Sequence, residues 1–199
     1  MNVDIWSDLA CPWCFIGTER FHKALAEFEG KDDVKVIWHS FQLDPELPDH
    51  YDGTEVDYLA ASKGMPRDQV EAMTDQVAGV AAGDGLNFDF AGLKVANSRL
   101  AHHLVHLAQL RGVAAPVSRG LFSAHFENAE DIGDRAVLTR IGVENGLEES
   151  DIAEALDEPA VLAALLVEHR EAVMARRDEL DALVDAIDTA LTSEATMSK

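Results

Sequence analysis

The first 41 residues run through a strand pattern, a helix pattern and a second strand pattern, and this order constrains the fold more than any other feature. Residues 2–7 and 34–41 are rich in β-branched and aromatic side chains. Residues 13–29 carry apolar side chains at helical spacing and are followed by Gly30, a helix stop. We therefore predict a βαβ unit whose two strands are parallel and whose crossover is right-handed.

The two cysteines of the chain, Cys11 and Cys14, stand at the junction between the first strand and this helix. A C-x-x-C pair near a βαβ pattern is typical of a thioredoxin-like redox motif. We expect Cys11 at the start of the helix, where Pro12 suits the first helical position and where free amides and the helix dipole favour a thiolate. Cys14 would be the recessed thiol that resolves a mixed disulfide formed at Cys11. Asp8 opposes this slightly because it adds negative charge nearby.

Two other interpretations of the cysteine pair stay open. Zinc needs four ligands, and the sequence has no second C-x-x-C and no histidine at ligand spacing to the first. Two inert cysteines in the core are the other alternative. Redox chemistry is favoured over both.

Other polar and aromatic residues give weaker signals. His102 and His106 share a helix face, but the Glu of H-E-x-x-H is missing, so solvated or packing histidines are favoured over a metal site. Asn97 is favoured as a helix cap over a ligand-binding amide. The three tryptophans are expected to differ in exposure. We expect Trp13 to be exposed beside the thiols, whereas Trp6 and Trp38 are expected to be core residues of the two strands.

Beyond Phe41 the pattern becomes helical. We expect helices that begin at Pro66, near Asn97, at Pro116, after Asp134 and at Ser150, followed by a long amphipathic stretch over 160–191 without Gly or Pro. The fold class is therefore α/β: a βαβ core joined to a large helical part and a long C-terminal helix.

Charge and hydropathy limit the partners. The net charge of −21 would repel the phosphates of nucleic acid. No apolar run approaches the roughly 18 residues that cross a bilayer, and the first residues lack the basic and apolar regions of a secretory leader. We therefore predict a cytoplasmic protein with neither a nucleic-acid nor a membrane partner. Thiols are kept reduced in that compartment, which favours a catalytic pair over a structural disulfide.

At the level of whole segments the sequence resembles the DsbA-like thioredoxin-fold proteins, in particular the cytoplasmic FrnE-type disulfide oxidoreductases associated with polyketide synthesis. The resemblance covers about residues 2 to 175. It rests on 7–17 (SDLACPWCFIG), 41–45 (FQLDP), 97–102 (NSRLAH), 121–126 (LFSAHF) and 131–134 (DIGD).

The resemblance implies a nucleophile at Cys11, a resolving thiol at Cys14, and redox tuning or substrate contact by Pro12 and Trp13. Asn97 and His102 are the remaining candidate residues of the cleft. It also implies a thiol- or disulfide-containing substrate, protein or small molecule, and no bound cofactor or metal, with glutathione as a possible co-substrate. The related 2-hydroxychromene-2-carboxylate isomerases and kappa-class glutathione transferases typically carry serine where Cys11 stands, so their chemistry is the enzyme alternative. The second alternative is a non-catalytic binding or chaperone-like protein.

The resemblance also divides the chain into a thioredoxin-like part, 1–44 with 160–199, and a helical insertion, 45–159. After Arg176, however, the family's cis-proline segment and last strands have no counterpart, and the last proline is Pro159. The core is therefore expected to be incomplete. A two-stranded sheet is marginal alone, so the C-terminal helix covers it, a second chain completes it as a homodimer, or the reading frame is truncated or shifted.

Overall fold

The computed structural model of this mixed α/β protein describes residues 1–49 and 51–157. Its elements are, in chain order, β1 (Asn2–Ser7), α1 (Pro12–Glu27), the short 3-10 helix η1 (Lys31–Asp33), β2 (Lys35–Ser40), α2 (Glu55–Lys63), α3 (Arg67–Gly83), α4 (Arg99–Leu110), α5 (Ala114–Phe126), α6 (Arg135–Glu144) and α7 (Glu149–Asp157). Met1–Glu158 packs as one unit. The second unit, Pro159–Lys199, contains the helical stretch predicted at 160–191 and lies outside the described residues.

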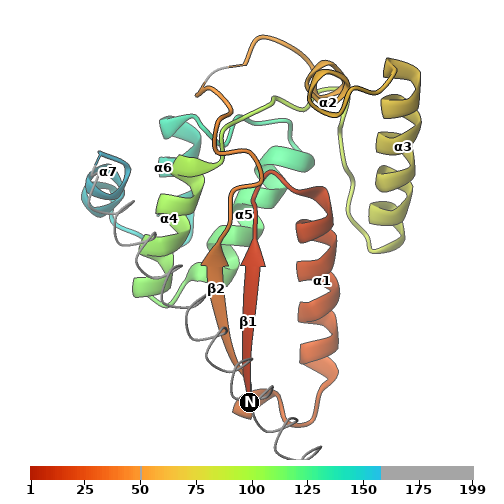
Figure 1. The fold of residues 1–199 in the computed structure, drawn as a ribbon. Helices are drawn as coiled ribbons and strands as arrows, with labels where there is room; N and C mark the ends of the chain where they lie inside the picture. Colours follow the sequence, from red (N-terminus) through yellow and green to blue (C-terminus); the bar gives the residue numbers. More distant parts are fainter. Residues whose placement is uncertain (50, 158–199) are drawn as a thin grey trace, which may run out of the picture. The chain divides into compact units, whose positions relative to one another are not determined.

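The predicted βαβ unit is confirmed. β1 and β2 pair in parallel, in a register that runs from Asn2 opposite Lys35 to Ser7 opposite Ser40, and their arrows point the same way in Figure 1. Within the described residues these two strands make up the whole sheet. Parallel strands need a crossover connection. Here α1 begins at the carboxyl end of β1 and runs back beside the strands to the start of β2. The fold thereby places Cys11 and Cys14 at the carboxyl end of the sheet.

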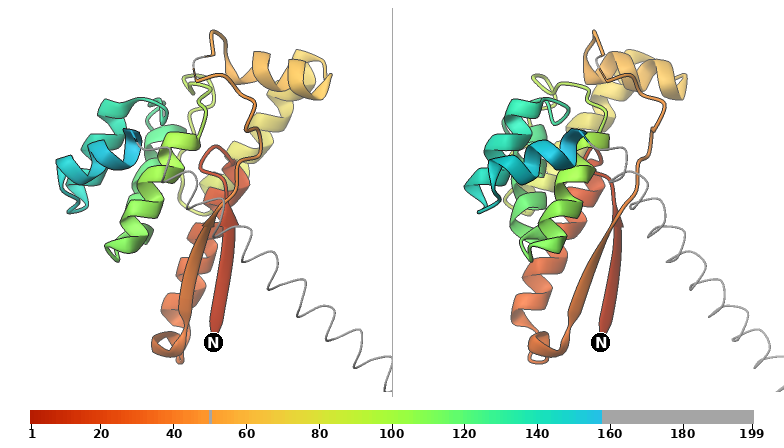
Figure 2. Two further views of the ribbon diagram at one scale, coloured as in Figure 1. Left: turned by 60° about the vertical axis from the view of Figure 1, so that its left-hand side comes forward. Right: turned by 90° about the vertical axis from the view of Figure 1, so that its left-hand side faces the viewer.

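One face of the two strands carries most of their buried apolar surface. In both views of Figure 2, α1, α4 and α5 lie on the same side of the strands. Ile5 pairs with Trp38 in the sheet register, and Trp38 is buried as predicted. The prediction for Trp6 is wrong, because its side chain points to the opposite face, stacks on His39 with ring centroids 4.5 Å apart, and stays 39% exposed.

An aromatic cluster fixes the first turn of α1 against α5. The Phe15 ring is fully buried and stacks on Phe122 at 4.9 Å, and Phe126 stacks in turn on Phe88 at 5.0 Å. Burying an aromatic side chain contributes several kcal/mol in core substitutions. Since Phe15 directly follows Cys14 in the sequence, this cluster fixes the position of Cys14 at the start of α1.

Most of the predicted helices are present with small shifts at their ends. α3 follows Pro66 as predicted, and α6 is capped by Asp134, whose carboxylate accepts the Ala136 amide at 2.7 Å. α5 begins at Ala114, two residues before the predicted start at Pro116, because proline is tolerated in the first turn where its missing amide is not needed. α7 begins one residue before the predicted Ser150.

The sequence analysis did not single out α2, although its start carries a recognisable signal. Thr54 accepts the Asp57 amide at 3.2 Å and the Asp57 carboxylate accepts the Thr54 amide at 3.1 Å, which is a capping box. Gly64 then ends the helix in the left-handed conformation, with φ at 63°. Few apolar side chains of α2 reach the core, so its periodicity is weak and only its ends are informative.

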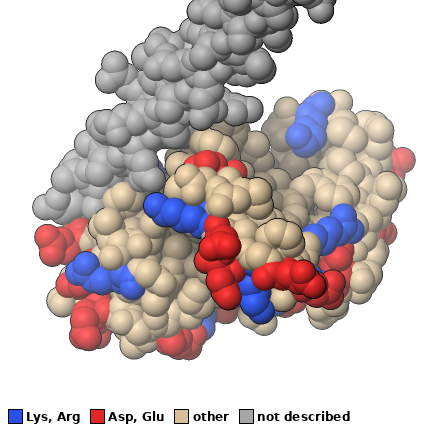
Figure 3. Space-filling view, turned by 90° about the horizontal axis from the view of Figure 1, so that it is seen from below, with Lys and Arg blue, Asp and Glu red and all other residues tan. Residues whose placement is uncertain are grey.

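Acidic and basic side chains are interspersed over the face shown in Figure 3. Several pair there or elsewhere on the described surface, such as Arg20 with Asp84 at 2.8 Å and Arg119 with Glu19 at 2.8 Å. In the part of the chain that the structure describes, no helix is both long and apolar enough to cross a membrane.

Candidate active site

Cys11 is the N-cap residue of α1, as the sequence predicts. Its backbone is extended, with φ −105° and ψ 115°, and Pro12 takes the first helical position. The Cys11 carbonyl accepts the amides of Cys14 at 3.1 Å and Phe15 at 3.3 Å, which starts the helix. No side chain caps the turn. The amides of Trp13 and Cys14 instead face the Cys11 sulfur, where they partly oppose the rise in its pKa that the Cys14 side chain and burial cause. The start of α1 therefore offers a thiolate the positive end of the helix.

The two thiols hydrogen-bond to each other and titrate as a pair. Donation from the Cys11 S–H lowers the pKa of Cys14 to about 6 and correspondingly raises that of Cys11. The Ser7 hydroxyl and the Asp8 backbone lower the Cys14 pKa further, whereas burial and the Asp8 charge raise it. The lowered value falls on Cys14 rather than on Cys11, where the sequence analysis placed it, because a shared proton couples the two. The pair loses its first proton near pH 6, and the remaining proton is shared between the two sulfurs.

Both sulfurs are half-buried, and the exposed member of the motif is Trp13. Cys11 and Cys14 are free thiols of intermediate exposure, so the predicted contrast between an exposed and a recessed thiol is small. Trp13 is 54% exposed, in line with the prediction, and Pro12 is partly exposed beside it. An indole in contact with solvent next to the thiols can contact a substrate.

Asp8 is a buried carboxylate beneath the motif that joins three segments. It is 3% exposed; one oxygen accepts the Ala10 amide at 3.2 Å and His102 Nε2 at 3.3 Å, and the other accepts the Leu43 amide at 2.6 Å. Burial alone raises the pKa of Asp8, but the hydrogen bond and charge of His102 outweigh it, with help from the Leu43 amide and the Ser98 hydroxyl, so its pKa is lowered. Asp8 is ionised at neutral pH and fixes the loop after β2 to the start of the motif.

His102 lies on α4 and is buried, which contradicts a solvated histidine and agrees with the packing alternative. Its ring faces Asp8 and brings α4 to the back of the dithiol. The neighbouring His103 is buried towards α7, and burial lowers its pKa. No group of three or more His, Cys, Asp and Glu side chains has metal-binding geometry within 1–49 and 51–157. His102 thus belongs to the surroundings of the thiols.

Asn97 is a buried amide that ties the loop after β2 to α4. Its oxygen accepts Gln42 Nε2 and the Arg99 amide, both at 2.9 Å, and its nitrogen donates to the Leu47 carbonyl. The helix begins at Arg99 with Ser98 as N-cap, one residue later than predicted, although Asn97 itself binds the first amide of the helix. The Asn97 amide is therefore occupied by the chain's own groups, which fits a structural cap.

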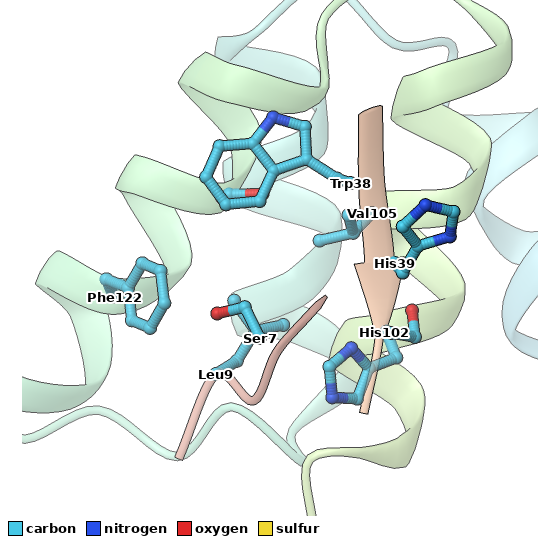
Figure 4. A pocket seen from close by; sticks show the side chains of 9 residues that line it. Ser7, Leu9, Trp38, His39, His102, Val105 and Phe122 are labelled. Carbon is cyan, nitrogen blue, oxygen red and sulfur yellow. The ribbon is translucent and has the colours of Figure 1, made fainter. Parts of the chain in front are cut away.

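A small pocket lies behind the motif, between the carboxyl ends of the strands and the helices α4 and α5. Figure 4 shows Ser7, His102 and Phe122 lining it, with Trp38 and His39 pointing to opposite sides of β2. Sequence analysis missed Ser7 and Ser118, and it treated Asp8 only as a negative charge near the thiols. The nearness of Ser7 and Asp8 to Cys11 in the sequence is a local signal, but nothing in the sequence points to Ser118.

Comparison with known proteins identifies the family. Residues 2–176 match the DSBA-like thioredoxin domain, and the chain belongs to this family. The crystal structure of probable DsbA oxidoreductase SCO1869 from Streptomyces coelicolor is 33% identical and superposes with a TM-score of 0.81, over 88% of this chain and 76% of that one. The family expected from the sequence is thus confirmed, and with it the DsbA-like thioredoxin fold.

Two further relatives are more distant. The uncharacterized protein YwbO of Bacillus subtilis (strain 168) is 25% identical over 158 residues, which make up 79% of this chain and 72% of that protein. The cytosolic disulfide reductase DsbM of Pseudomonas aeruginosa is 23% identical with a TM-score of 0.60, over 88% of this chain and 79% of that one. At that identity DsbM supports the fold alone.

Proposed function

We propose that this protein is a cytoplasmic thiol–disulfide oxidoreductase in which Cys11 attacks the substrate and Cys14 resolves the intermediate. The observation that carries the proposal is the position of both thiols at the first turn of α1, where they share a proton and the pair ionises near pH 6. Thiolate is the reactive form in disulfide exchange. A pair that ionises near pH 6 is largely in that form at neutral pH.

The reaction transfers a disulfide without a bound cofactor. The Cys11 thiolate attacks one sulfur of a substrate disulfide, a mixed disulfide forms, and the other substrate sulfur leaves as a thiol. Cys14 then attacks Cys11, which releases the second substrate thiol and closes the Cys11–Cys14 disulfide. The substrate is reduced by two electrons and the enzyme is oxidised by two; the reverse sequence oxidises a substrate dithiol. Protein or small-molecule disulfides both fit the proposal, and glutathione is a reasonable reductant in a reducing compartment.

The family assignment supports the class of chemistry, and the similar structure from Streptomyces coelicolor is described as a probable oxidoreductase. A cytoplasmic location is part of the proposal: free thiols suit a reducing compartment, and the fold neighbour DsbM is described as cytosolic.

The proposal is tested by the reduction of insulin with dithiothreitol as the electron source. Wild-type protein is expected to accelerate the reaction, Cys11→Ser to give only the background rate, and Cys14→Ser to stop after one turnover as a mixed disulfide. Circular dichroism confirms that each variant is folded. Activity that requires glutathione and survives Cys14→Ser would contradict the proposal and favour an isomerase or transferase. Client binding without any exchange would favour a non-catalytic binding protein.

A further inference from the structure

The loop that follows β2 lies directly beside the dithiol, because Asp8 joins the two. The backbone carbonyl of Asp8 accepts the Cys11 amide at 3.2 Å, and its carboxylate accepts the Leu43 amide at 2.6 Å. The Leu43 side chain is 62% exposed. Leu43 and the next residue, Asp44, therefore form one border of the site around the nucleophile.

Asp44 connects this border to α2. Its carboxylate accepts the Tyr58 hydroxyl at 2.7 Å. Burial raises the pKa of Tyr58, and so do the hydrogen bond to Asp44 and the negative charges of Asp44, Glu55 and Asp8. Figure 1 shows α2 beyond the carboxyl end of the strands, where α1 begins. Three carboxylates thus act on one hydroxyl at the end of the sheet that carries the dithiol.

Positive charge is scarce in the two segments that surround the thiols. Residues 1–18 contain two acidic side chains and residues 41–62 contain six, and neither range contains Lys or Arg. A substrate that approaches Cys11 past the loop after β2 therefore meets a negative potential.

Some of these carboxylates are neutralised by neighbouring cations. Asp57 pairs with the first arginine of α3, and Asp49 pairs with the first arginine of α4. Within 1–49 and 51–157, no Lys or Arg forms an ion pair with Asp44 or Glu55. Burial raises the pKa of Glu55 to about 7, against the charge of Lys63, so Glu55 is about half ionised at neutral pH. The charge of Asp44 remains uncompensated beside the motif.

The indole of Trp13 is a second feature that favours positive charge. Trp13 lies between the two cysteines in the sequence, and it is 54% exposed. Among aromatic side chains, the indole attracts ammonium and guanidinium groups most strongly through its ring face. An exposed indole and an unpaired carboxylate beside one nucleophile are together complementary to a cationic group.

We propose that the site selects disulfides by charge. It reacts faster with disulfides that carry positive charge near the sulfur, such as those of cysteines flanked by Lys or Arg, than with anionic ones, and Asp44, Glu55 and Trp13 determine this preference. The inference rests on the proposed exchange reaction and adds a substrate class to it.

The chemical step itself is unchanged. Cys11 attacks one substrate sulfur, the mixed disulfide forms, and the other sulfur leaves as a thiol. The charges alter how often a substrate reaches the thiolate in a productive position. Because glutathione is anionic, the same charges slow it as a reductant and do not exclude it.

Three small disulfides of similar size separate the effect of charge from that of reactivity. Cystamine is dicationic at pH 7, 2-hydroxyethyl disulfide is uncharged, and 3,3′-dithiodipropionate is dianionic. The reduced full-length protein is mixed with each in excess, quenched with acid, and its oxidation is followed by mass spectrometry. Each rate is divided by the rate of dithiothreitol, an uncharged thiol, with the same disulfide, which removes the intrinsic reactivity of the disulfide.

We expect the normalised rate with cystamine to exceed that with dithiodipropionate by about fivefold to fiftyfold at low salt. One charge that acts through about 8 Å of water changes a rate about twofold per unit of substrate charge, and several charges act together. The uncharged disulfide should lie between the two. The ratio should fall severalfold between about 0.01 and 1 M salt, because the screening length shrinks from about 30 to about 3 Å.

Asp44→Asn removes one charge and keeps an oxygen that can accept the Tyr58 hydroxyl. It should lower the ratio of the two normalised rates by about twofold to fivefold at low salt. Asp32→Asn is the matched control, because it makes the same change of charge on the exposed η1, at the opposite end of the sheet and roughly 20 Å away. It should leave the ratio within about 1.5-fold of wild type.

Two further variants test the other residues. Glu55→Gln should lower the ratio more at pH 8 than at pH 6, because wild-type Glu55 is largely protonated at pH 6 and ionised at pH 8. Both rates in a ratio are measured at one pH, so the thiolate fraction cancels. Trp13→Leu removes the aromatic face and should lower the ratio by about twofold to fivefold.

Equal normalised rates for cystamine and dithiodipropionate, or a ratio that does not fall in 1 M salt, would overturn the selection by charge. Equal effects of Asp44→Asn and Asp32→Asn would overturn the role of Asp44. An unchanged ratio in Glu55→Gln at pH 8 or in Trp13→Leu would overturn the role of that residue. A wild-type protein that reacts with none of the three disulfides faster than dithiothreitol does would contradict the proposed function itself, so the two failures are distinguishable.

Discussion

The carboxylate of Asp8 offers the most direct test of how the site is held together. It is 3% exposed and accepts hydrogen bonds from Ala10, Leu43 and His102. Asn has the same shape but replaces one acceptor oxygen with an NH₂ donor, so at least one of the three donors loses its partner. A hydrogen bond to a charged group contributes about 1.5–3 kcal/mol, and an unsatisfied buried donor costs about 1–3 kcal/mol. Asp8→Asn should therefore lower the free energy of unfolding by about 2–4 kcal/mol.

Urea unfolding of the reduced protein at pH 7 measures this loss, provided that the slope of free energy against urea is unchanged. Asp4→Asn is the matched control. Asp4 also pairs with a histidine, His39, at 2.8 Å, but its side chain is 40% exposed. An exposed pair contributes less than about 1 kcal/mol. Equal losses in the two variants would refute the view that the buried carboxylate organises the site.

The pH dependence of the difference has a definite sign. Because its hydrogen bonds lower the folded pKa of Asp8 below the unfolded value of 3.8, the ionised group stabilises the fold above that value. The stabilisation is lost as the pH falls through the lowered folded pKa. The difference between wild type and Asp8→Asn should persist at pH 5 and shrink only below about pH 4. A stability difference that disappeared between pH 7 and pH 5 would show that a group other than Asp8 causes it.

Three further predictions concern acid stability, thiol ionisation and helix packing. Burial lowers the pKa of His125 from 6.5 to about 4, so the folded state resists protonation and the free energy of unfolding should fall by about 3 kcal/mol between pH 6.5 and 4. Urea unfolding across this range should show a smaller fall in His125→Gln. Thiolate absorbance of the reduced protein should titrate near pH 6, and Cys11→Ala should raise the pKa of the remaining Cys14 towards about 8.5 because the S–H donor is lost. Gly142→Ala should cost about 1–3 kcal/mol in urea unfolding, because its Cβ would lie 2.5 Å from a methyl of α7, whereas Gly79→Ala, with nothing within 4 Å, should be neutral or stabilising.

The parts of this fold that the sequence predicts are those determined by local periodicity. The βαβ unit follows from two strand patterns around one helix pattern, and Cys11 lies at the N-cap because Pro12 can occupy only the first turn. Helix caps with polar side chains, such as Asp134, are equally local. For the same reason α2 was missed: its capping box was present in the sequence, but its apolar pattern is too weak to indicate a helix without it.

The contacts that complete the site are not predictable in this way. Asp8 and His102 are 94 residues apart, and their contact depends on how α4 packs behind the strands. A buried histidine and a solvated one have the same sequence signal when their helix also carries apolar residues on neighbouring faces. Trp6 shows the converse error: alternation in a strand identifies two faces, but it does not say which face the helices cover.

The surroundings of the two thiols differ in the same way: those of Cys11 are set by local sequence, whereas those of Cys14 also depend on tertiary packing. The amides that favour a charge on Cys11 belong to the same turn as the motif, so any chain that places C-P-W-C at a helix start provides them. The Cys14 pKa depends in addition on Ser7 and Asp8, and Asp8 is held by His102 of α4, within the segment that the sequence analysis predicts to be an insertion. A motif that is unchanged in sequence can therefore keep the reactivity of its first thiol and differ in that of its second. On this reasoning, substitutions that remove the contact of α4 with Asp8 should alter how fast the mixed disulfide resolves more than how fast it forms.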